Sequence, residues 1–404
     1  MKKYILLITI FIFLFHHFSF GQGSTYSGSY TSSSPIVLEN VSNQTINGLE
    51  ISNSSGRCIY LSNCSNVTIK NCKLGPSSGE GIYLANCTNI TVTNCSMDAV
   101  ASGVVADVAS GIKVTYNDVR NVQGPMPRGQ MVQFGNVTGT GNVISYNAGE
   151  NIAGQSYPED EISLYMSSGT ADDPIQVVGN WIRGGGPSAS GGGIMTGDMG
   201  GSYILVQDNV LVNPGQYGIT IASGHDIIIK NNKIFSEKTA VSNVGLSAYK
   251  QYEVDTYSNT IMNNQVNFTN KNGILNDMWN SGNAGTITGW NTNVHNANLN
   301  SSILPSTIIG RAKLAGTDVT TPTAVNYKIS PNPSFGESII VSSDTPNAIK
   351  MAVYSSTGQK MIDQSISSTR TVVDTSSLTA GVYVVKISNA DDSVVEARKI
   401  TVKK

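Results

Sequence analysis

Charged residues are scarce in this sequence. Only 13% of its 404 residues are Asp, Glu, Lys or Arg, and the formal net charge is −2. A chain this close to neutral lacks the basic surface that binding to nucleic acid or to an anionic membrane requires. We therefore expect no nucleic-acid partner and no electrostatic attachment to a membrane.

Histidine is scarcer still. The chain has four, and two of them, His16 and His17, lie in the first 20 residues. Catalytic zinc usually takes two or three imidazoles, so His225 and His295 alone argue against a zinc site. A serine triad would have to use one of these two, and neither lies beside a Gly-x-Ser-x-Gly turn. The sequence therefore disfavours both chemistries.

The N-terminus is typical of a secretion signal. Lys2 and Lys3 precede an apolar run over residues 4–15, and small residues before Gln22 fit a cleavage site. The run is shorter than the ~20 apolar residues of a membrane span, and no later segment approaches that length. We predict a cleaved signal peptide over residues 1–21 and no membrane span after cleavage. A retained anchor is the alternative.

The sequence is rich in self-similarity. Residues 36–51, 59–74 and 82–97 align without gaps and read IVLENVSNQTINGLEI, IYLSNCSNVTIKNCKL and IYLANCTNITVTNCSM. Apolar residues alternate within each short run, which is the period of a strand, and no helical period interrupts them. Such units stack as parallel strands ~4.8 Å apart, so the sequence predicts a β-helix of about nine rungs.

One turn position recurs along the repeat. It is occupied by Leu49, Cys72, Cys95, Asn117, Asn147, Asn180, Asn209, Asn232 and Asn264. A stacked amide can donate to one neighbouring turn and accept from the other, which keeps buried turn groups hydrogen-bonded. This column resembles the asparagine ladder of pectate-lyase-like right-handed β-helix proteins over residues 30–290. The resemblance implies an all-β, right-handed parallel β-helix over residues 22–290, but no single activity, because that fold carries many.

The cysteines follow the same register. Cys64 aligns with Cys87, and Cys72 aligns with Cys95, one rung apart. Export permits disulfides, but side chains stacked ~4.8 Å apart are further apart than the ~3.8 Å between the β-carbons of a relaxed bridge. We expect a reduced stack that packs as small apolar groups. Bridges within the two pairs are the alternative.

The composition changes near residue 326. Residues 291–325 are polar and irregular, as expected of a cap and linker, and short alternating strands follow them. The Pro-Asn-Pro at 331–333, the hairpin at 354–358, Leu378 with Gly381 and Tyr383, and the basic last strand resemble the C-terminal sorting domain of type IX secretion substrates.

That resemblance implies a small β-sandwich over residues 326–404 that engages the type IX secretion machinery. It also implies a protein that is secreted or attached to the outer-membrane surface. A carbohydrate-binding sandwich is the alternative, and we expect a monomer.

In pectate-lyase-like helices the ligand lies on the outer face of the strand before the non-ladder turn. By resemblance, residues 131–133, 162–164, 194–196 and 219–221 belong to that strand, which aligns Gln130 with Glu161. We expect one outward face to carry four catalytic candidates, Arg128, Glu159, Asp160 and Glu161. The candidates for contacting substrate are Gln130, Tyr165, Asp173, Asp198, Tyr217 and His225, with Asp173, Ser202 and His225 in one column.

Several hypotheses fit these residues. Paired carboxylates can protonate a glycosidic oxygen and activate water, or hold Ca²⁺ while Arg128 neutralises a uronate. We therefore expect a lyase or glycoside hydrolase acting on extracellular polysaccharide, with Ca²⁺ as the one cofactor considered. A non-catalytic glycan-binding or adhesion protein is the alternative. The acidic residues also suit solvated turns, as Asp172-Asp173-Pro174 illustrates, and no active-site signature of pectate lyases or polygalacturonases is visible.

Overall fold

The computed structural model describes residues 23–310, 328–331, 334, 338–342, 350–355, 360–366, 370–388 and 394–404. The predicted signal peptide lies outside these ranges. The chain divides into two compact units, with the boundary between Gly316 and Thr317. None of the helices in the described ranges has the length and apolar character that crossing a bilayer requires.

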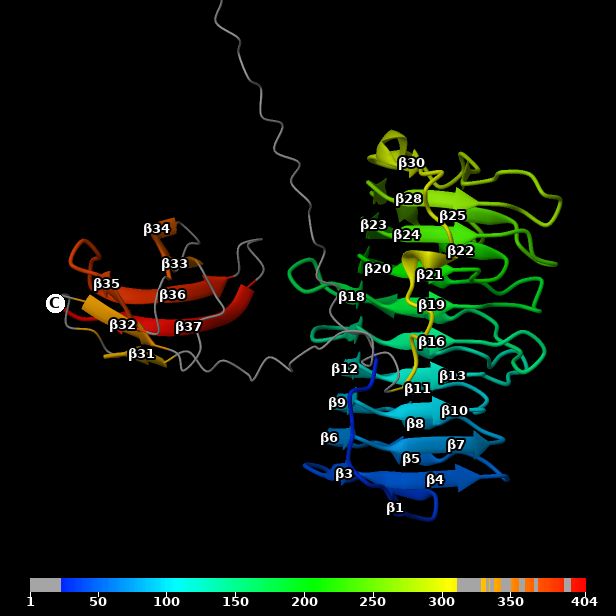
Figure 1. Cartoon of the computed structure of the whole chain (residues 1–404), viewed down its shortest axis with the longest axis horizontal. Coiled ribbons are helices and arrows are strands. Elements are labelled where there is room, and N and C mark those ends of the chain that lie inside the picture. The colour runs from blue at the N-terminus through cyan, green and yellow to red at the C-terminus, as the bar shows by residue number, and fades with distance from the viewer. Residues whose placement is uncertain are drawn as a thin grey trace, which may run out of the picture. The chain divides into compact units, whose positions relative to one another are not determined.

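The first unit is a parallel β-helix, as predicted, in which three short strands form each rung (Figure 1). The first column of strands contains β1 (Thr31–Ser32), β4 (Leu49–Asn53), β7 (Lys73–Ser77), β10 (Ser96–Asp98), β13 (Asp118–Arg120), β16 (Ala148–Glu150), β19 (Trp181–Arg183), β21 (Val210–Val212), β24 (Lys233–Ser236), β28 (Gln265–Phe268) and β30 (Val294–His295). Every strand of this column pairs in parallel with the next one.

Two further columns complete the rungs. The second column contains β2 (Ile36–Glu39), β5 (Ile59–Ser62), β8 (Ile82–Ala85), β11 (Val104–Asp107), β14 (Val132–Gly135), β17 (Ile162–Ser168), β20 (Ile194–Gln207), β22 (Tyr217–Ile221), β25 (Val244–Ala248) and β29 (Met278–Asn280). The third contains β3 (Thr45–Asn47), β6 (Ser65–Lys70), β9 (Thr88–Thr93), β12 (Ser110–Thr115), β15 (Val143–Ser145), β18 (Ile175–Val178), β23 (Gly224–Lys230), β26 (Thr256–Tyr257) and β27 (Thr260–Met262). The long strand β20 pairs with strands of both columns.

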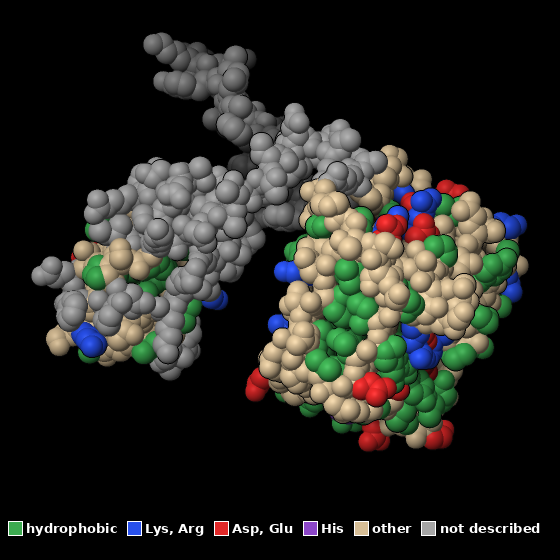
Figure 2. Space-filling model, turned by 90° about the horizontal axis from the view of Figure 1, so that it is seen from below, with side chains coloured by type: hydrophobic (Ala, Val, Ile, Leu, Met, Phe, Trp, Pro, Cys, Tyr) green, Lys and Arg blue, Asp and Glu red, His purple; other side chains and the backbone are tan. Residues whose placement is uncertain are grey.

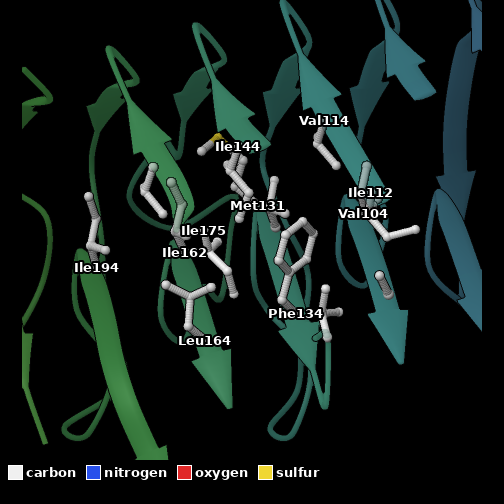
Figure 3. Packing of buried hydrophobic residues seen from close by; sticks show 14 of the residues in the cluster. Val104, Ile112, Val114, Met131, Phe134, Ile144, Ile162, Leu164, Ile175 and Ile194 are labelled. Carbon is white, nitrogen blue, oxygen red and sulfur yellow. The ribbon is translucent and has the colours of Figure 1, made fainter. Parts of the chain in front are cut away.

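Apolar side chains from all three columns fill the interior. Figure 3 shows Val104, Phe134, Ile162 and Ile194 of the second column packing against Ile112 and Ile144 of the third, and all six are fully buried. Burying one such aliphatic or aromatic side chain contributes roughly 1.5–3 kcal/mol relative to exposure. Because each rung stacks on the next, identical residue types meet along the axis, and this is why the repeat is visible in the sequence.

The predicted asparagine ladder is present. The Nδ2 group of Asn117 donates to Oδ1 of Asn147 at 3.0 Å, and the same bond links Asn147 to Asn180 and Asn180 to Asn209. The ladder continues through Asn232 and Asn264, and it extends one rung beyond the prediction, to Asn293. Most of these amides also donate to a backbone carbonyl of the preceding rung, so the buried turn groups are satisfied.

Cysteines continue the ladder toward the N-terminus. The Asn117 amide accepts from the Cys95 backbone N–H, and the thiol of Cys95 contacts the carbonyls of Ile69 and Thr93, as an asparagine amide would. All five cysteines are free and buried, as the prediction of a reduced stack required. The thiols therefore act as small packing groups with a weak hydrogen bond.

Two extended segments run along the outside of the β-helix and meet at one carboxylate. Asp118 at the start of β13 is 2% exposed, and its Oδ1 accepts from the backbone N–H of Ser24 while its Oδ2 accepts from that of Gly310. The second segment follows the 3₁₀ helices η1 (Trp290–Thr292) and η2 (Ser301–Ile303), and its Leu304 and Ile308 pack with Trp181 of β19. Asp118 therefore ties both ends of the unit to its middle rungs.

The second unit contains two small antiparallel sheets. One has the order β31 (Lys328–Ser330), β32 (Ser338–Ser342), β35 (Arg370–Asp374), and the other has the order β34 (Lys360–Ser365), β33 (Lys350–Ser355), β36 (Gly381–Ser388), β37 (Val394–Val402). Leu378 and Tyr383 lie in its own hydrophobic core, and the Tyr383 hydroxyl donates to the Thr379 carbonyl at 2.9 Å. Parts of the Pro-Asn-Pro and hairpin motifs lie outside the described residues.

Candidate functional site

The outward face of the second column carries the strongest cluster of polar groups. Charged side chains are few on the β-helix, as Figure 2 shows for the end that carries β1. On the face of the second column, the reference position of each rung is Ile59 or the residue aligned with it. The residue two places before this position and the residue directly after it point away from the core. The first of these rows contains Arg57, Glu80, Ser102, Gln130, Asp160, Gly192 and Tyr217, and the second contains Tyr60, Tyr83, Val105, Gln133, Ser163, Met195 and Thr220.

The predicted register was wrong by one residue at one rung. Val132, and not Met131, pairs with Ile162, so Gln130 lies beside Asp160 and Met131 lies beside Glu161. The residue directly before β5 and β14 is buried in the core (Cys58 and Met131), and Glu161 occupies the same position before β17. Asp160 is therefore the outward carboxylate of this rung, and Glu161 points into the core.

Asp160 is held by a tyrosine that reaches across a glycine. The Tyr217 hydroxyl and the backbone N–H of Gly192 both donate to Oδ1 of Asp160. Gly192 lies in the rung between them, and a β-carbon there would come within 2.7 Å of the Tyr217 ring. The missing side chain at Gly192 thus makes room for the tyrosine, while Asp160 and Tyr217 are 9% and 4% exposed.

The environment of Asp160 favours its protonated form. Its pKa is raised to about 7, mainly by burial and also by the nearby charges of Glu159 and Asp198, while the hydrogen bonds from Tyr217 and Gly192 oppose the rise. Both hydrogen bonds to this carboxyl group end on Oδ1. Oδ2 accepts neither of these bonds, so it is the oxygen that carries the proton when this carboxyl group is neutral.

A second carboxylate lies on the same face. Asp198 in β20 pairs in register with Tyr165 of β17, and its Oδ1 accepts from the Tyr252 hydroxyl at 3.1 Å. Burial raises the pKa of Asp198, and the Tyr252 bond opposes that rise. Burial raises the pKa of Tyr249 most, and the charges of Asp160 and Asp198 raise it further. The phenol of Tyr249 therefore lies close enough to both acids to interact with them electrostatically.

Glu161 does not belong to this face, contrary to expectation. It is fully buried, and both of its carboxyl oxygens accept from Nδ2 of Asn151, at 2.8 and 2.9 Å. Burial raises the pKa of Glu161 well above its usual value. Burial therefore favours the protonated form of Glu161, and its side chain has no exposed surface for a substrate to contact.

The Glu161→Gln variant should lose a pH dependence of stability. An acid with a raised pKa in the folded state stabilises the protein fully below its unfolded pKa, about 4.5, and this stabilisation is lost as pH rises. The wild type should lose up to about 1.4 kcal/mol per pH unit relative to the variant above that pH. Chemical unfolding of both proteins across pH 4–8 measures the difference.

Glu253 provides the matched surface control, because its side chain is 98% exposed. The Glu253→Gln variant should follow the wild type at every pH. Parallel stability curves for the wild type and Glu161→Gln would contradict a neutral, buried Glu161.

Arg128 also departs from the prediction. Its loop lies beside Glu159, whose backbone N–H donates to the Gly129 carbonyl at 3.0 Å. The guanidinium, however, turns the opposite way, forms an ion pair with Glu80 and lies 5.7 Å from the ring centre of Tyr83. Arg128 thus belongs to a separate cluster near β8, because the buried carboxylate of Glu80 attracts it more strongly than the half-buried Glu159.

The other predicted residues are dispersed. Gln130 is buried and accepts from the Ser102 hydroxyl at 2.9 Å, and Glu159 accepts from the Ser190 hydroxyl at 2.6 Å. Asp173 lies in a turn, where its Oδ2 accepts from the Gly141 N–H. His225 contacts Asp226 through Nδ1 and stacks on Tyr257 at 4.5 Å.

The expected column of Asp173, Ser202 and His225 is half right. Ser202 pairs with His225, but its partner in the preceding rung is Ser168. Asp173 falls outside the column because the residues between Ser168 and Ile175 form a turn, whereas their partners Ser202 and Ile204 lie in one continuous strand. Only Asp160, Asp198, Tyr217 and Tyr165 of the predicted residues come together.

Four residues that contribute side chains to the outward face of the second column were not predicted. Tyr249 and Tyr252 come from the loop after β25, and Arg57 and Glu80 precede β5 and β8. The tyrosine-rich segment at 249–257 was the signal for the first pair. The alignment of Arg57 with Glu80 at the 23-residue spacing was the signal for the second.

In the described part of the chain, no group of three or more His, Cys, Asp or Glu side chains is arranged to hold a metal ion.

Two known families match this chain. Residues 34–198 match the right handed beta helix region, and residues 328–403 match the secretion system C-terminal sorting domain. The chain is a right-handed β-helix followed by a type IX secretion sorting domain. The sorting domain directs the β-helix to the cell surface or the medium, as the sequence predicted.

Solved structures with similarity to the chain include two kinds of carbohydrate-bound protein. The catalytic domain of a GH87 α-1,3-glucanase in complex with nigerose is 16% identical, with a TM-score of 0.39 over 63% of this chain and 50% of that one. A tailspike variant of E. coli bacteriophage HK620 in complex with a pentasaccharide is 10% identical, with a TM-score of 0.36 over 89% and 81%. This chain spans about half of the glucanase domain. No protein with a curated function matches the sequence.

Deleting residues 327–404 should stop export across the outer membrane and leave the β-helix domain in the periplasm. The deletion removes the match to the sorting domain, while the predicted signal peptide over residues 1–21 stays. Cell fractionation and immunoblotting measure the distribution. Because the two units have separate cores, the truncated protein should unfold at the same temperature as the β-helix of the full chain. Normal secretion of the truncated chain would contradict this role of the domain.

Proposed function

We propose that this exported β-helix hydrolyses an extracellular polysaccharide, with Asp160 as the acid that protonates the glycosidic oxygen. The observation that carries the proposal is the placement of Asp160: a buried carboxyl group on the outward face, with both hydrogen bonds on Oδ1. A general acid must keep its proton near neutral pH, and a pKa of about 7 allows this.

Asp198 supplies the second group that glycoside hydrolysis needs. It is less buried than Asp160 and accepts a hydrogen bond from Tyr252, which favours its ionised form. As a carboxylate it takes a proton from water while that water attacks the anomeric carbon, and Asp160 gives its proton to the departing oxygen. The tyrosines Tyr165, Tyr249 and Tyr252 offer ring surfaces against which sugars can stack.

The same groups favour hydrolysis over elimination. A lyase needs a base that removes the proton next to a uronate carboxyl group. Around Asp160 the phenols of Tyr217 and Tyr249 both have raised pKa values, mainly because they are buried, so they hold their protons more tightly than a free tyrosine.

A screen of the mature protein against neutral and acidic polysaccharides tests the proposal. New reducing ends without products that absorb in the ultraviolet support hydrolysis. Unsaturated, ultraviolet-absorbing products would identify a lyase, and retention of a polymer without any product would identify a binding protein. Either of the last two results overturns the proposal.

A further inference from the structure

The face that carries Asp160 continues toward the N-terminal rungs and reaches a cluster of two arginines. Arg57 and Arg128 both form ion pairs with Glu80, whose side chain is only 6% exposed. Although burial works to raise it, hydrogen bonds from its own backbone and from Arg128, with the charges of both arginines, hold the pKa of Glu80 below its usual value. Glu80 is therefore a fixed anion that positions two cations.

Both arginines use only Nε for this contact. The Nε atom of Arg57 donates to Oε2 of Glu80 at 2.6 Å, and that of Arg128 donates to Oε1. Their Nη groups donate to no described residue, and the two side chains are 40% and 28% exposed. A guanidinium fork held by one edge presents its other donors to solvent, in the geometry that carboxylate and sulfate groups accept.

Aromatic rings lie under the same guanidinium groups. Arg57 is 4.3 Å from the ring centre of Tyr83 and 5.3 Å from that of Tyr60, while Arg128 is 5.7 Å from Tyr83. These contacts keep both cations over the strand face. Two arginines paired with one glutamate leave one positive charge at this cluster. A further acid, Asp107, accepts a hydrogen bond from the Tyr83 hydroxyl at 3.5 Å.

We propose that Arg57 and Arg128 form an anion-binding subsite, so that the polysaccharide that occupies this face carries carboxylate or sulfate groups. The inference rests on the proposed function, because it takes a glycan to lie along the face past Asp160. The strands β8, β11, β14 and β17 are consecutive in the second column. Three steps of ~4.8 Å place Glu80, which holds both guanidinium groups, ~14 Å along the axis from Asp160, within the span of a short oligosaccharide.

The test measures the binding of the full mature chain to four polymers. Polygalacturonate and its fully methyl-esterified form are the uronate pair, and a sulfated galactan and its desulfated form are the sulfate pair. The variants are Arg57→Met, Arg57→Met with Arg128→Met, and Lys113→Met. Lys113 is an exposed cation on β12 of the third column, and its replacement controls for the change in net charge.

The wild type should prefer one anionic polymer over its neutral partner, and the preferred pair identifies the anion. Each lost arginine should weaken that binding by about tenfold, or about 1.4 kcal/mol, because a charge-assisted hydrogen bond to the anion is lost. Lys113→Met should bind as the wild type does. The single variant Arg57→Met keeps the Arg128–Glu80 pair, so it reports on the site even if the double variant fails to fold.

Equal weakening on charged and neutral polymers, or no weakening on either, would overturn the subsite. Its failure is separable from that of hydrolysis. Cleavage of a neutral polymer with no effect of the arginine variants rejects only the subsite. Charge-dependent binding by the arginines without cleavage of any polymer rejects only hydrolysis.

Discussion

Replacing Asp160 by Asn should lower kcat for polysaccharide hydrolysis by about 10²- to 10⁴-fold, the contribution of a positioned general acid. Asn keeps the shape of the side chain and an oxygen that can accept from Tyr217 and Gly192, but it has no acidic proton to give. Folding should be retained, which circular dichroism checks. Steady-state kinetics with the polymer found in the screen measures the loss.

The pH dependence of activity tests whether Asp160 itself is the general acid. Activity of the wild type should fall as pH rises through about 7, where Asp160 loses its proton. The Tyr217→Phe variant should move this fall to higher pH, because the Tyr217 hydrogen bond lowers the pKa of Asp160. Glu159→Gln is the matched control, since Glu159 is the adjacent acid but bonds to Ser190. If Asp160→Asn kept wild-type activity, or if Glu159→Gln lost as much, Asp160 would not be the acid.

The β-helix could be predicted from the sequence because equivalent positions in neighbouring rungs carry similar residues. Ile59, Ile82 and Ile162 occupy one inward position in successive or nearby rungs, and each is fully buried. A side chain that must pack on its own equivalent above and below tolerates few alternatives, so the period survives as sequence identity. The same reasoning predicted the asparagine column.

The site could be predicted only in part, because it depends on segments that do not repeat. Residues 131–134 read Met-Val-Gln-Phe, and both frames of alternation offer apolar residues. In the structure Val132 and Phe134 point into the core together. The loop before β14 has no repeat, so its length could not show which of the two alternating sets of residues is buried. Glu161 was misplaced for a different reason: alternation stops just before the strand, so Glu161 and Ile162 are adjacent in sequence and both buried.

Loop paths account for the other misses. Tyr252 approaches Asp198 from the segment after β25, 54 residues away in sequence, and Arg128 reaches back across two rungs to Glu80. Alternation within strands carries no information about such contacts. The direction of a long side chain depends on which charge lies nearest in space, and that is set by the loops.

Replacing Asn209 by Leu should destabilise the β-helix by about 4 kcal/mol. The Oδ1 atom of Asn209 accepts from both nitrogens of Asn180, and its Nδ2 donates to the Val177 carbonyl and to Asn232. Leu removes all four bonds and leaves the Asn180 donors and the Val177 carbonyl buried without partners, at roughly 1–3 kcal/mol each before relaxation. Chemical unfolding of the mature protein, followed by circular dichroism, measures the loss.

Two further variants separate the ladder from a general effect of the substitution. Asn291→Leu changes an exposed residue in η1, outside the ladder, and should stay within about 0.5 kcal/mol of the wild type. Asn209→Cys should lose less than Asn209→Leu, because Cys72 and Cys95 already hold the equivalent position and their thiols contact turn carbonyls. A weak thiol donor can satisfy the Val177 carbonyl but offers Asn180 only a poor acceptor. Equal losses for Asn209→Leu and Asn291→Leu would show that the amide column is not what holds these turns together.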